Sequence, residues 1–292
     1  MQDITFIGFG EAGGAIVSGW GARDGIAAYD LKTDAPDTAA AMRDRMTAHG
    51  VTPCDSAAQA VARADMVLCT VTADQAVTAA RTAAPHLRPG TIWCDLNSCA
   101  PSSKREAAAI VEGAGGRYVD VAVMAPVHPK LNMVPLLVSG PHAGEVAPLL
   151  AALPMAPRVV EGPVGAASSI KMIRSVMVKG LEALTAECTL AAVAAGVEDE
   201  VLGSLMKSHP GTDWPGQAAY NFERALVHGA RRAAEMEEVA KTLRDLGLPD
   251  DMARATVLWE RRIAATGLPA PEDARATGPR AIAETLLPAL RG

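Results

Sequence analysis

Residues 4–30 constrain the fold more than any other stretch, because they combine an apolar run, spaced glycines and a terminal acid. The run Ile4–Ile7 leads into Gly8-x-Gly10-x-x-Gly13, and the stretch closes on Asp30. A strand, three glycines at this spacing, a helix and a second strand that ends in a carboxylate predict a βαβ unit that binds a dinucleotide. The alternative is a glycine-rich turn of the kind found in any α/β protein.

Each glycine has a separate expected role. Gly8 permits a tight turn, Gly10 leaves room for the pyrophosphate, and Gly13 lets the helix lie close to the strand. The phosphates are then expected on free N–H groups where the helix begins, at Glu11 and Ala12.

Asp30 bears on the choice of cofactor. It lies 20 residues after Gly10, where its carboxylate can accept hydrogen bonds from the adenosine ribose and repel the 2′-phosphate of NADP. This predicts NAD. Lys32 could reach a 2′-phosphate, so NADP is not excluded, although Lys32 could equally be a solvated loop lysine.

The order of patterns along the chain predicts two domains. Up to residue 161, strand-like runs at 26–30, 66–71, 91–94, 118–122, 136–138 and 158–160 are interleaved with helical stretches, which is typical of a mostly parallel sheet covered on both faces. From Gly165 onward only Ala/Leu-rich helical stretches occur. We therefore predict an α/β Rossmann-type dinucleotide-binding domain over 1–161 and an all-α substrate and dimerisation domain over 162–292.

Composition excludes several classes of function. The 292 residues carry a formal net charge of −6, which argues against nucleic acid as a partner. No run approaches a membrane span, and the first strand begins too near Met1 to leave room for a signal or transit peptide. The five cysteines show neither CxxC nor metal-ligand spacing, and Cys69 and Cys94 are expected as buried thiols of a reducing compartment. These features predict a cytoplasmic protein without a metal.

Three further motifs match, in order, those of a known family. Lys171 falls six residues after Gly165, as in GxGxxxKxxN; Asp120-Val-Ala-Val-Met-Ala-Pro126 is similar to DxPVSGG; and Asp95-Leu-Asn-Ser98 is similar to D-x-S-T. The chain thus resembles the β-hydroxyacid dehydrogenase family, which includes 6-phosphogluconate dehydrogenase, and most closely the subgroup whose C-terminal domain has no assigned function. The resemblance implies hydride transfer between nicotinamide and a small anionic hydroxy acid or oxo acid, Lys171 as the catalytic residue, and a homodimer.

The substrate segment departs from that family. Met124 stands in place of a substrate-binding serine, Ala125 and Pro126 replace the glycine pair, and Arg174 replaces the asparagine after the lysine. Pro126 also removes a backbone N–H donor. The substrate contacts are therefore expected to differ from the usual ones.

Lys171 is a candidate without the family as well. Lys171, Arg174 and Ser175 share one face of a predicted helix. A neighbouring guanidinium and a partly dry site both disfavour the ammonium form, and a neutral lysine can accept the alcohol proton as hydride leaves. The alternative is a surface lysine on an amphipathic helix.

The remaining candidates lie after the strand ends and on one later helix. Cofactor contacts are expected at Thr70, Val71, Thr72 and Asn97, and substrate contacts at Ser98, Val123, Met124, His128, Arg174, Ser175, His228, Arg231 and Arg232. Asn97 and Ser98 could instead cap the helix near Pro101. Ion pairing on the helix surface is the alternative for His228, Arg231 and Arg232.

The sequence therefore predicts an NAD(P)-dependent hydroxy acid dehydrogenase. Two rivals stay open. One is imine reduction on the same fold, against which Lys171 counts. The other is a sensor that binds NAD(H) but has lost turnover.

Overall fold

The structure is a computed structural model that describes residues 3–291. The chain divides into two compact units, which we call the N-terminal unit (1–172) and the helical unit (173–292). The N-terminal unit extends beyond the last strand into the first turns of a long helix, and it includes Lys171. The boundary expected between residues 161 and 162 stays a prediction.

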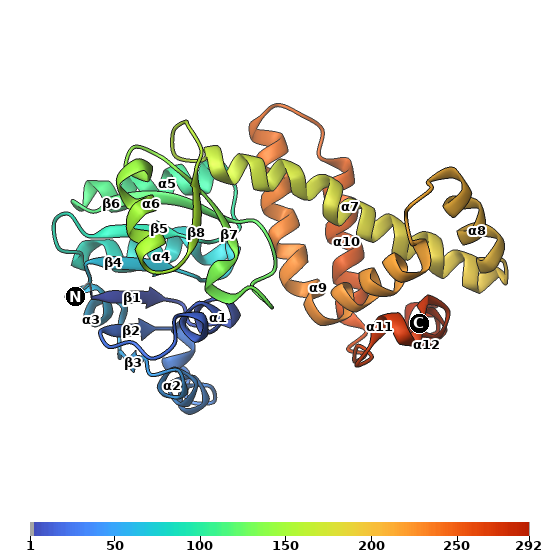
Figure 1. The fold of residues 1–292 in the computed structure, drawn as a ribbon, viewed down its shortest axis with the longest axis horizontal. Helices are drawn as coiled ribbons and strands as arrows, with labels where there is room; N and C mark the ends of the chain where they lie inside the picture. Colours follow the sequence, from blue (N-terminus) through green and yellow to red (C-terminus); the bar gives the residue numbers. More distant parts are fainter. Residues whose placement is uncertain (1–2, 292) are drawn as a thin grey trace. The chain divides into compact units, whose positions relative to one another are not determined.

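The described part of the N-terminal unit contains one eight-stranded sheet in the order β3-β2-β1-β4-β5-β6-β7-β8 (Figure 1). All neighbouring strands are parallel except β6 and β7. The strands are β1 (Ile4–Ile7), β2 (Ile26–Tyr29), β3 (Thr52–Pro53), β4 (Met66–Cys69), β5 (Ile92–Asp95), β6 (Arg117–Val123), β7 (Pro135–Ser139) and β8 (Ala156–Val159). The Rossmann-type class is confirmed, while the antiparallel direction of β7 and the two-residue β3 were not predicted.

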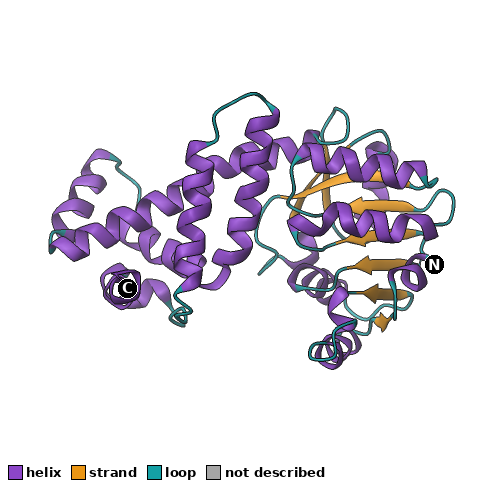
Figure 2. Ribbon diagram, turned by 180° about the vertical axis from the view of Figure 1, so that it is seen from behind, coloured by secondary structure: helices purple, strands orange, loops and turns teal. Residues whose placement is uncertain are grey.

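Helices cover both faces of this sheet (Figure 2). They are α1 (Glu11–Trp20), α2 (Ala39–Ala48), α3 (Ala57–Val61), α4 (Ala76–Ala83), α5 (Pro101–Gly113) and α6 (Ala143–Ala152). Because side chains alternate along a strand, Phe6 packs in the core under α1, α2 and α6, while Trp93 packs in the core under α3, α4 and α5. The sheet is therefore buried on both faces, and the free ends of its strands are left for binding.

The helical unit begins inside α7 (Ala166–Ala195) and continues through α8 (Glu198–Ser208), α9 (Trp214–Asp245), α10 (Asp251–Ala265), α11 (Ala274–Thr277) and α12 (Pro279–Arg291). Gly196, with φ of +70°, ends α7 in the left-handed region that favours glycine. The core of the helical unit includes Leu190, Phe222 and Ile263. The all-helical prediction for this part of the chain is confirmed.

Candidate active site

The first glycine of the motif lies in a backbone conformation that only glycine tolerates well. Gly8 follows β1 with φ of +84°, and a Cβ there would lie 2.8 Å from both the Thr70 carbonyl oxygen and Val71 Cγ1. The Thr70 hydroxyl also donates to the Gly8 carbonyl at 2.7 Å. The segment after β4, a predicted cofactor contact, thus holds the glycine loop in place.

The next two glycines leave space where the pyrophosphate is expected. A Cβ on Gly10 would have no heavy atom within 4 Å, and no side chain caps the N-terminus of α1. A Cβ on Gly13 would lie 3.1 Å from Phe9, because α1 packs closely on the strand. Open space at Gly10, beside the first residues of α1, Glu11 and Ala12, fits the diphosphate of a dinucleotide.

Asp30 lies at the carboxyl end of β2, against the same loop. Its Oδ2 accepts a hydrogen bond from the Phe9 N–H at 2.7 Å, and its Oδ1 accepts one from the Lys32 N–H at 2.9 Å. The carboxylate is therefore fixed beside the glycine loop, which is the position expected for a ribose acceptor. The Lys32 residue is exposed.

Asn97 is buried just beyond β5 and carries an unpaired acceptor. Its Nδ2 donates to Asp95 Oδ1 at 2.7 Å and to Cys69 Sγ at 3.3 Å, which fixes the orientation of the amide. Its Oδ1 accepts no hydrogen bond from any residue that the structure describes. A buried acceptor left in this state at the carboxyl edge of the sheet fits a donor from a bound ligand. The N-cap position of α5 is Ala100, which makes no side-chain cap hydrogen bond, so neither Asn97 nor Ser98 occupies that position as the alternative suggested.

Lys171 and Ser98 are brought together in the N-terminal unit. The Lys171 ammonium donates a hydrogen bond to Ser98 Oγ, although the two residues are 73 positions apart. Both side chains are partly buried. Because β1, β2, β4 and β5 are parallel, Ser98 follows a strand at the same sheet edge as the glycine loop and Asp30.

A buried network of charged side chains lies beneath this contact. Lys104 donates to Asp95 Oδ1 at 2.9 Å, and its Nζ lies 3.5 Å from Asp120 Oδ1; all three side chains are fully buried. Asp95 also accepts the Asn97 N–H and the Tyr118 hydroxyl. Burial alone lowers the pKa of Lys104, but the two carboxylates outweigh it and hold that pKa above its usual value. Lys104 therefore stays charged.

The same network binds the start of α7. Asp120 Oδ2 accepts hydrogen bonds from the N–H groups of Gly165 and Ser168 at 3.1 Å, and Asp120 Oδ1 accepts the Ser168 hydroxyl at 2.5 Å. A carboxylate is favourable here because helix N-termini carry a partial positive charge. Lys171 lies one turn further along α7, so the network joins the segment that bears Ser98 to the helix that bears Lys171.

Lys104 was not among the predicted site residues. It stands in an apolar stripe of α5 with Ala107, Ala108 and Val111, all of which are buried. A lysine in such a stripe, after two aspartates at neighbouring strand ends, is the feature that could have indicated it.

The predicted substrate segment lies at the end of β6. Val123 and Met124 are half-buried, and Met124 packs against the cluster that contains Ala167 of α7. His128 is exposed in the loop after this segment. Met124 therefore lies near the start of the helix that carries Lys171, whereas Val123 packs against the core that contains Phe6.

Two of the candidates in the helical unit, Arg231 and Arg232, are engaged in ion pairs. Arg232 is buried and contacts Glu182 and Glu260, and Arg231 donates to Glu235 at 2.9 Å. Lys179 also pairs with Glu235. Arg174 is exposed, Ser175 is buried and His228 is half-buried. Roles in substrate binding for these residues stay predictions, and the alternative of ion pairing describes what Arg231 and Arg232 do in the structure.

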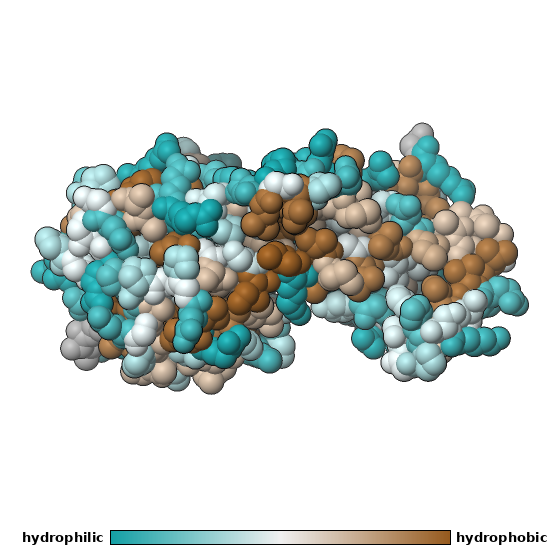
Figure 3. All heavy atoms as spheres, turned by 90° about the horizontal axis from the view of Figure 1, so that it is seen from above, coloured by the Kyte–Doolittle hydropathy of each residue, from teal (hydrophilic) through white to brown (hydrophobic). Residues whose placement is uncertain are grey.

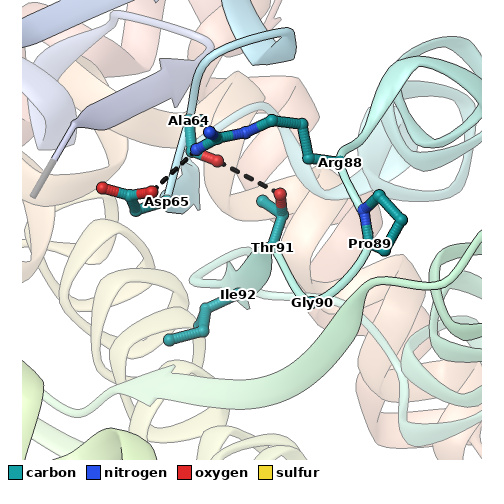
Figure 4. A pocket seen from close by; sticks show the side chains of 7 residues that line it. All are labelled: Ala64, Asp65, Arg88, Pro89, Gly90, Thr91 and Ile92. Atoms are coloured by element: carbon teal, nitrogen blue, oxygen red, sulfur yellow. Dashed lines mark hydrogen bonds and ion pairs between the residues drawn. The ribbon is translucent and has the colours of Figure 1, made fainter.

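A hollow also lies at the opposite edge of the sheet. It is lined by Ala64, Asp65, Arg88, Pro89, Gly90, Thr91 and Ile92, before β4 and β5 (Figure 4). Arg88 pairs with Asp65, and the Thr91 hydroxyl donates to the Ala64 carbonyl, so these polar groups already satisfy one another.

Within residues 3–291, no three His, Cys, Asp or Glu side chains are grouped to hold a metal ion. No described helix is long and apolar enough to span a membrane.

The NAD-binding domain of 6-phosphogluconate dehydrogenase matches residues 3–153, which is more than half of the chain. The chain belongs to this family. Residues 192–263 match a second domain, whose function is unknown. Family membership, NAD as the cofactor and an NAD-dependent oxidoreductase are thereby confirmed.

Similar proteins extend over almost the whole chain. A solved conserved hypothetical protein from Sinorhizobium meliloti is 41% identical with a TM-score of 0.75, over 99% of this chain and 97% of that one. The 3-hydroxyisobutyrate dehydrogenase of Mycobacterium tuberculosis shares the fold, at 22% identity and a TM-score of 0.72, over 98% and 99%. An NAD-dependent L-serine dehydrogenase of Pseudomonas aeruginosa is 26% identical, over 88% of this chain and 87% of its own.

Proposed function

We propose that this protein is a hydroxy acid dehydrogenase in which Lys171 is the general acid and base. The observation that carries the proposal is the hydrogen bond from Lys171 to Ser98, at the sheet edge that bears the glycine loop and Asp30. The relative named as an L-serine dehydrogenase supports a small hydroxy acid, or the corresponding oxo acid, as substrate. The proposed reaction needs no metal ion.

The chemistry divides between the cofactor and the chain. When bound, the nicotinamide ring supplies the hydride acceptor or donor. In the oxidation direction, neutral Lys171 accepts the hydroxyl proton at Nζ while the carbinol carbon loses hydride and becomes a carbonyl carbon. In the reduction direction, the Lys171 ammonium returns that proton to the oxygen. Ser98 Oγ accepts a hydrogen bond from Nζ and so orients the amine.

The substrate wall on this side of the lysine is apolar. Met124 stands where a serine would hold a carboxylate, Ala125 and Pro126 stand where a glycine pair would, and Pro126 offers no N–H. We therefore propose that the carboxylate of the substrate is bound from another direction. Arg174, exposed one helical turn after Lys171, is our first candidate.

Substitution of Lys171 tests the proposal. Lys171→Ala should lower kcat by about 10²- to 10⁴-fold with one of a panel of hydroxy acids, while the Kd for NADH stays within twofold, since general acid–base catalysis contributes on that order. Lys171→Arg should be almost as damaging, because arginine keeps the charge but does not release a proton near neutral pH. Rates are followed by NADH absorbance.

Three results would contradict the proposal. Near-wild-type turnover by Lys171→Arg would make Lys171 a charge contact. NADH binding without hydride transfer to any hydroxy acid or oxo acid would favour the sensor. Turnover of imines alone would favour imine reduction.

We further propose a homodimer located in the cytoplasm. Along α7, the exposed hydrophobic residues Ile173, Met177, Leu181 and Leu184 recur at a spacing that places them on one helix face. Figure 3 shows hydrophobic surface along this part of the chain. Exposed apolar stripes of this kind mark interfaces. A monomer mass in light scattering of the dilute protein would contradict the dimer.

A further inference from the structure

One cation outside the predicted site lies against the glycine loop. Arg45, on the last turn of α2, donates from Nη2 to the Gly10 carbonyl at 3.1 Å. Gly10 is the glycine beside which the structure leaves open space. Arg45 is exposed and 35 residues away in sequence, so the spacing of the motif did not indicate it.

Two further contacts hold the end of α2 at this position. The His49 ring meets Phe9, the residue between the first two glycines, edge to face at 5.6 Å between centroids. A Cβ on Gly14 would lie 3.0 Å from Arg45 Nη2, so the guanidinium lies over the first turn of α1. The absence of a side chain at Gly14 makes this close approach possible.

Arg45 forms no ion pair with the residues that the structure describes. No carboxylate among residues 3–291 lies within 4 Å of its guanidinium, whereas Arg43, two residues earlier, pairs with Asp55 at 3.1 Å. A guanidinium carries five N–H donors, and the contact with Gly10 uses one. Two carboxylates, Glu11 and Asp30, flank the same loop. A cation beside the loop would offset the repulsion that these two acids exert on a doubly charged anion.

We propose that Arg45 binds the pyrophosphate of the dinucleotide from the flank of α1. The N–H groups at the start of α1 would hold the diphosphate, and Arg45 would add a charged, directional contact from the flank of the helix. The pyrophosphate is common to NAD and NADP. Arg45 therefore contributes to the affinity for both cofactors and does not select between them. This inference depends on cofactor binding and is independent of the dehydrogenase activity proposed above.

Calorimetric titration of NADH, NADPH and ADP into the full-length protein tests the inference. Arg45→Ala should raise all three Kd values by a similar factor of about 5- to 30-fold, the range of one partly exposed charged hydrogen bond. The factor should shrink at about 0.5 M salt, because exposed charges are screened. The Kd values of Arg45→Lys should lie between those of wild type and Arg45→Ala, since the ammonium keeps the charge but lacks the paired N–H donors of the guanidinium. Arg43→Ala, the matched control on the same helix, should bind all three ligands within twofold of wild type.

Specific outcomes would overturn the inference. Binding of NADH and ADP by Arg45→Ala within twofold of wild type would remove Arg45 from the site. A loss confined to NADPH would assign Arg45 to the 2′-phosphate instead. An equal loss in Arg43→Ala would show a general effect of surface charge. None of these outcomes depends on Lys171 or on turnover.

Discussion

Each unit of this protein buries a group of charged side chains, and the two groups are built differently. In the N-terminal unit, Asp95 and Asp120 accept hydrogen bonds from backbone N–H groups, and both carboxylates also form ion pairs with Lys104. In the helical unit, Arg232 joins Glu182 and Glu260 by side-chain contacts alone, and Glu260 Oε2 accepts no hydrogen bond from the described residues. A charge bound by the backbone fixes where a segment lies, whereas a charge bound by side chains holds neighbouring helices together.

Removal of Lys104 should have the largest effect on stability. Lys104→Met leaves two fully buried carboxylates without their cation, and breaking a buried pair in this way costs about 3–5 kcal/mol of unfolding free energy. Because the network joins the segments that carry Ser98 and Lys171, we also expect turnover to be lost under conditions where the variant is folded. Urea unfolding with a parallel rate assay measures both. A variant that is as stable and as active as wild type would show that the network positions nothing.

Removal of Arg232 should destabilise the protein without changing cofactor binding. Arg232→Met leaves Glu182 and Glu260 unpaired and should cost about 3 kcal/mol at pH 7, while the Kd for NADH stays within twofold. Weakened NADH binding in the folded variant would contradict the division of roles between the two networks.

The loss of unfolding free energy in Arg232→Met should depend on pH. Burial already raises the pKa of Glu260, and Arg232 opposes that shift, so the variant raises the pKa further. A raised carboxyl pKa contributes stability below the unfolded value of about 4.3, and this contribution is lost as pH rises through the folded value. The deficit relative to wild type should therefore be smallest near pH 4.5 and grow toward pH 7. A deficit that is constant over this range in thermal unfolding would contradict the expectation.

Removal of the Ser168 hydroxyl tests whether the Asp120 contacts affect turnover separately from the stability of the fold. Ser168→Ala removes one hydrogen bond to Asp120 at the start of α7 and should cost about 1 kcal/mol. Thr189→Ala, which removes a buried hydroxyl bonded to the Thr185 carbonyl of the same helix, is the matched control. We expect kcat to fall several-fold in Ser168→Ala and to be unchanged in Thr189→Ala, with similar melting temperatures. Equal kcat values in the two variants would reduce the Asp120 contacts to a structural role.

The smallest expected effect concerns the choice between NAD and NADP. Asp30→Asn removes the charge that is expected to face the ribose, while its single amide oxygen can still accept one of the two N–H groups, that of Phe9. The ratio of the Kd values for NADPH and NADH should fall several-fold, because repulsion of the 2′-phosphate is lost. A wild-type protein that prefers NADPH would show that Lys32 dominates over Asp30.

The sequence specified the local features of the fold well. The spacing of Gly8, Gly10 and Gly13 reflects local backbone geometry, and the alternation of strand and helix patterns is likewise local, so both could be predicted. The direction in which a strand runs within the sheet depends on contacts with distant segments, and the antiparallel direction of β7 was therefore missed. Burial of Cys69 and Cys94 was expected from their apolar runs, and burial raises the pKa of each thiol to about 12.

The site was only partly predictable, because its side chains meet through tertiary contacts. Lys171 and Ser98 were each candidates on the strength of their motifs, but no pattern indicated that the two side chains touch. The contact of Arg45 with Gly10 depends on where α2 lies, and the burial of Lys104 depends on two carboxylates from neighbouring strands. No single segment of sequence contains this information.

The capping of α7 by Asp120 and Ser139 has a consequence for how this protein can be divided. A fragment ending at residue 161 would lack Gly165, Ala167 and Ser168. The backbone N–H groups of these three residues donate hydrogen bonds to the Asp120 and Ser139 side chains. The fragment would leave a buried carboxylate without these donors, although it would contain every strand of the sheet. A fragment ending at residue 172 would retain the donors. For the same reason, a chimaera that takes its helical domain from a relative should have its junction inside α7, after Lys171. The number of residues in the helix should be preserved, because each inserted residue rotates the remainder of the helix by about 100°.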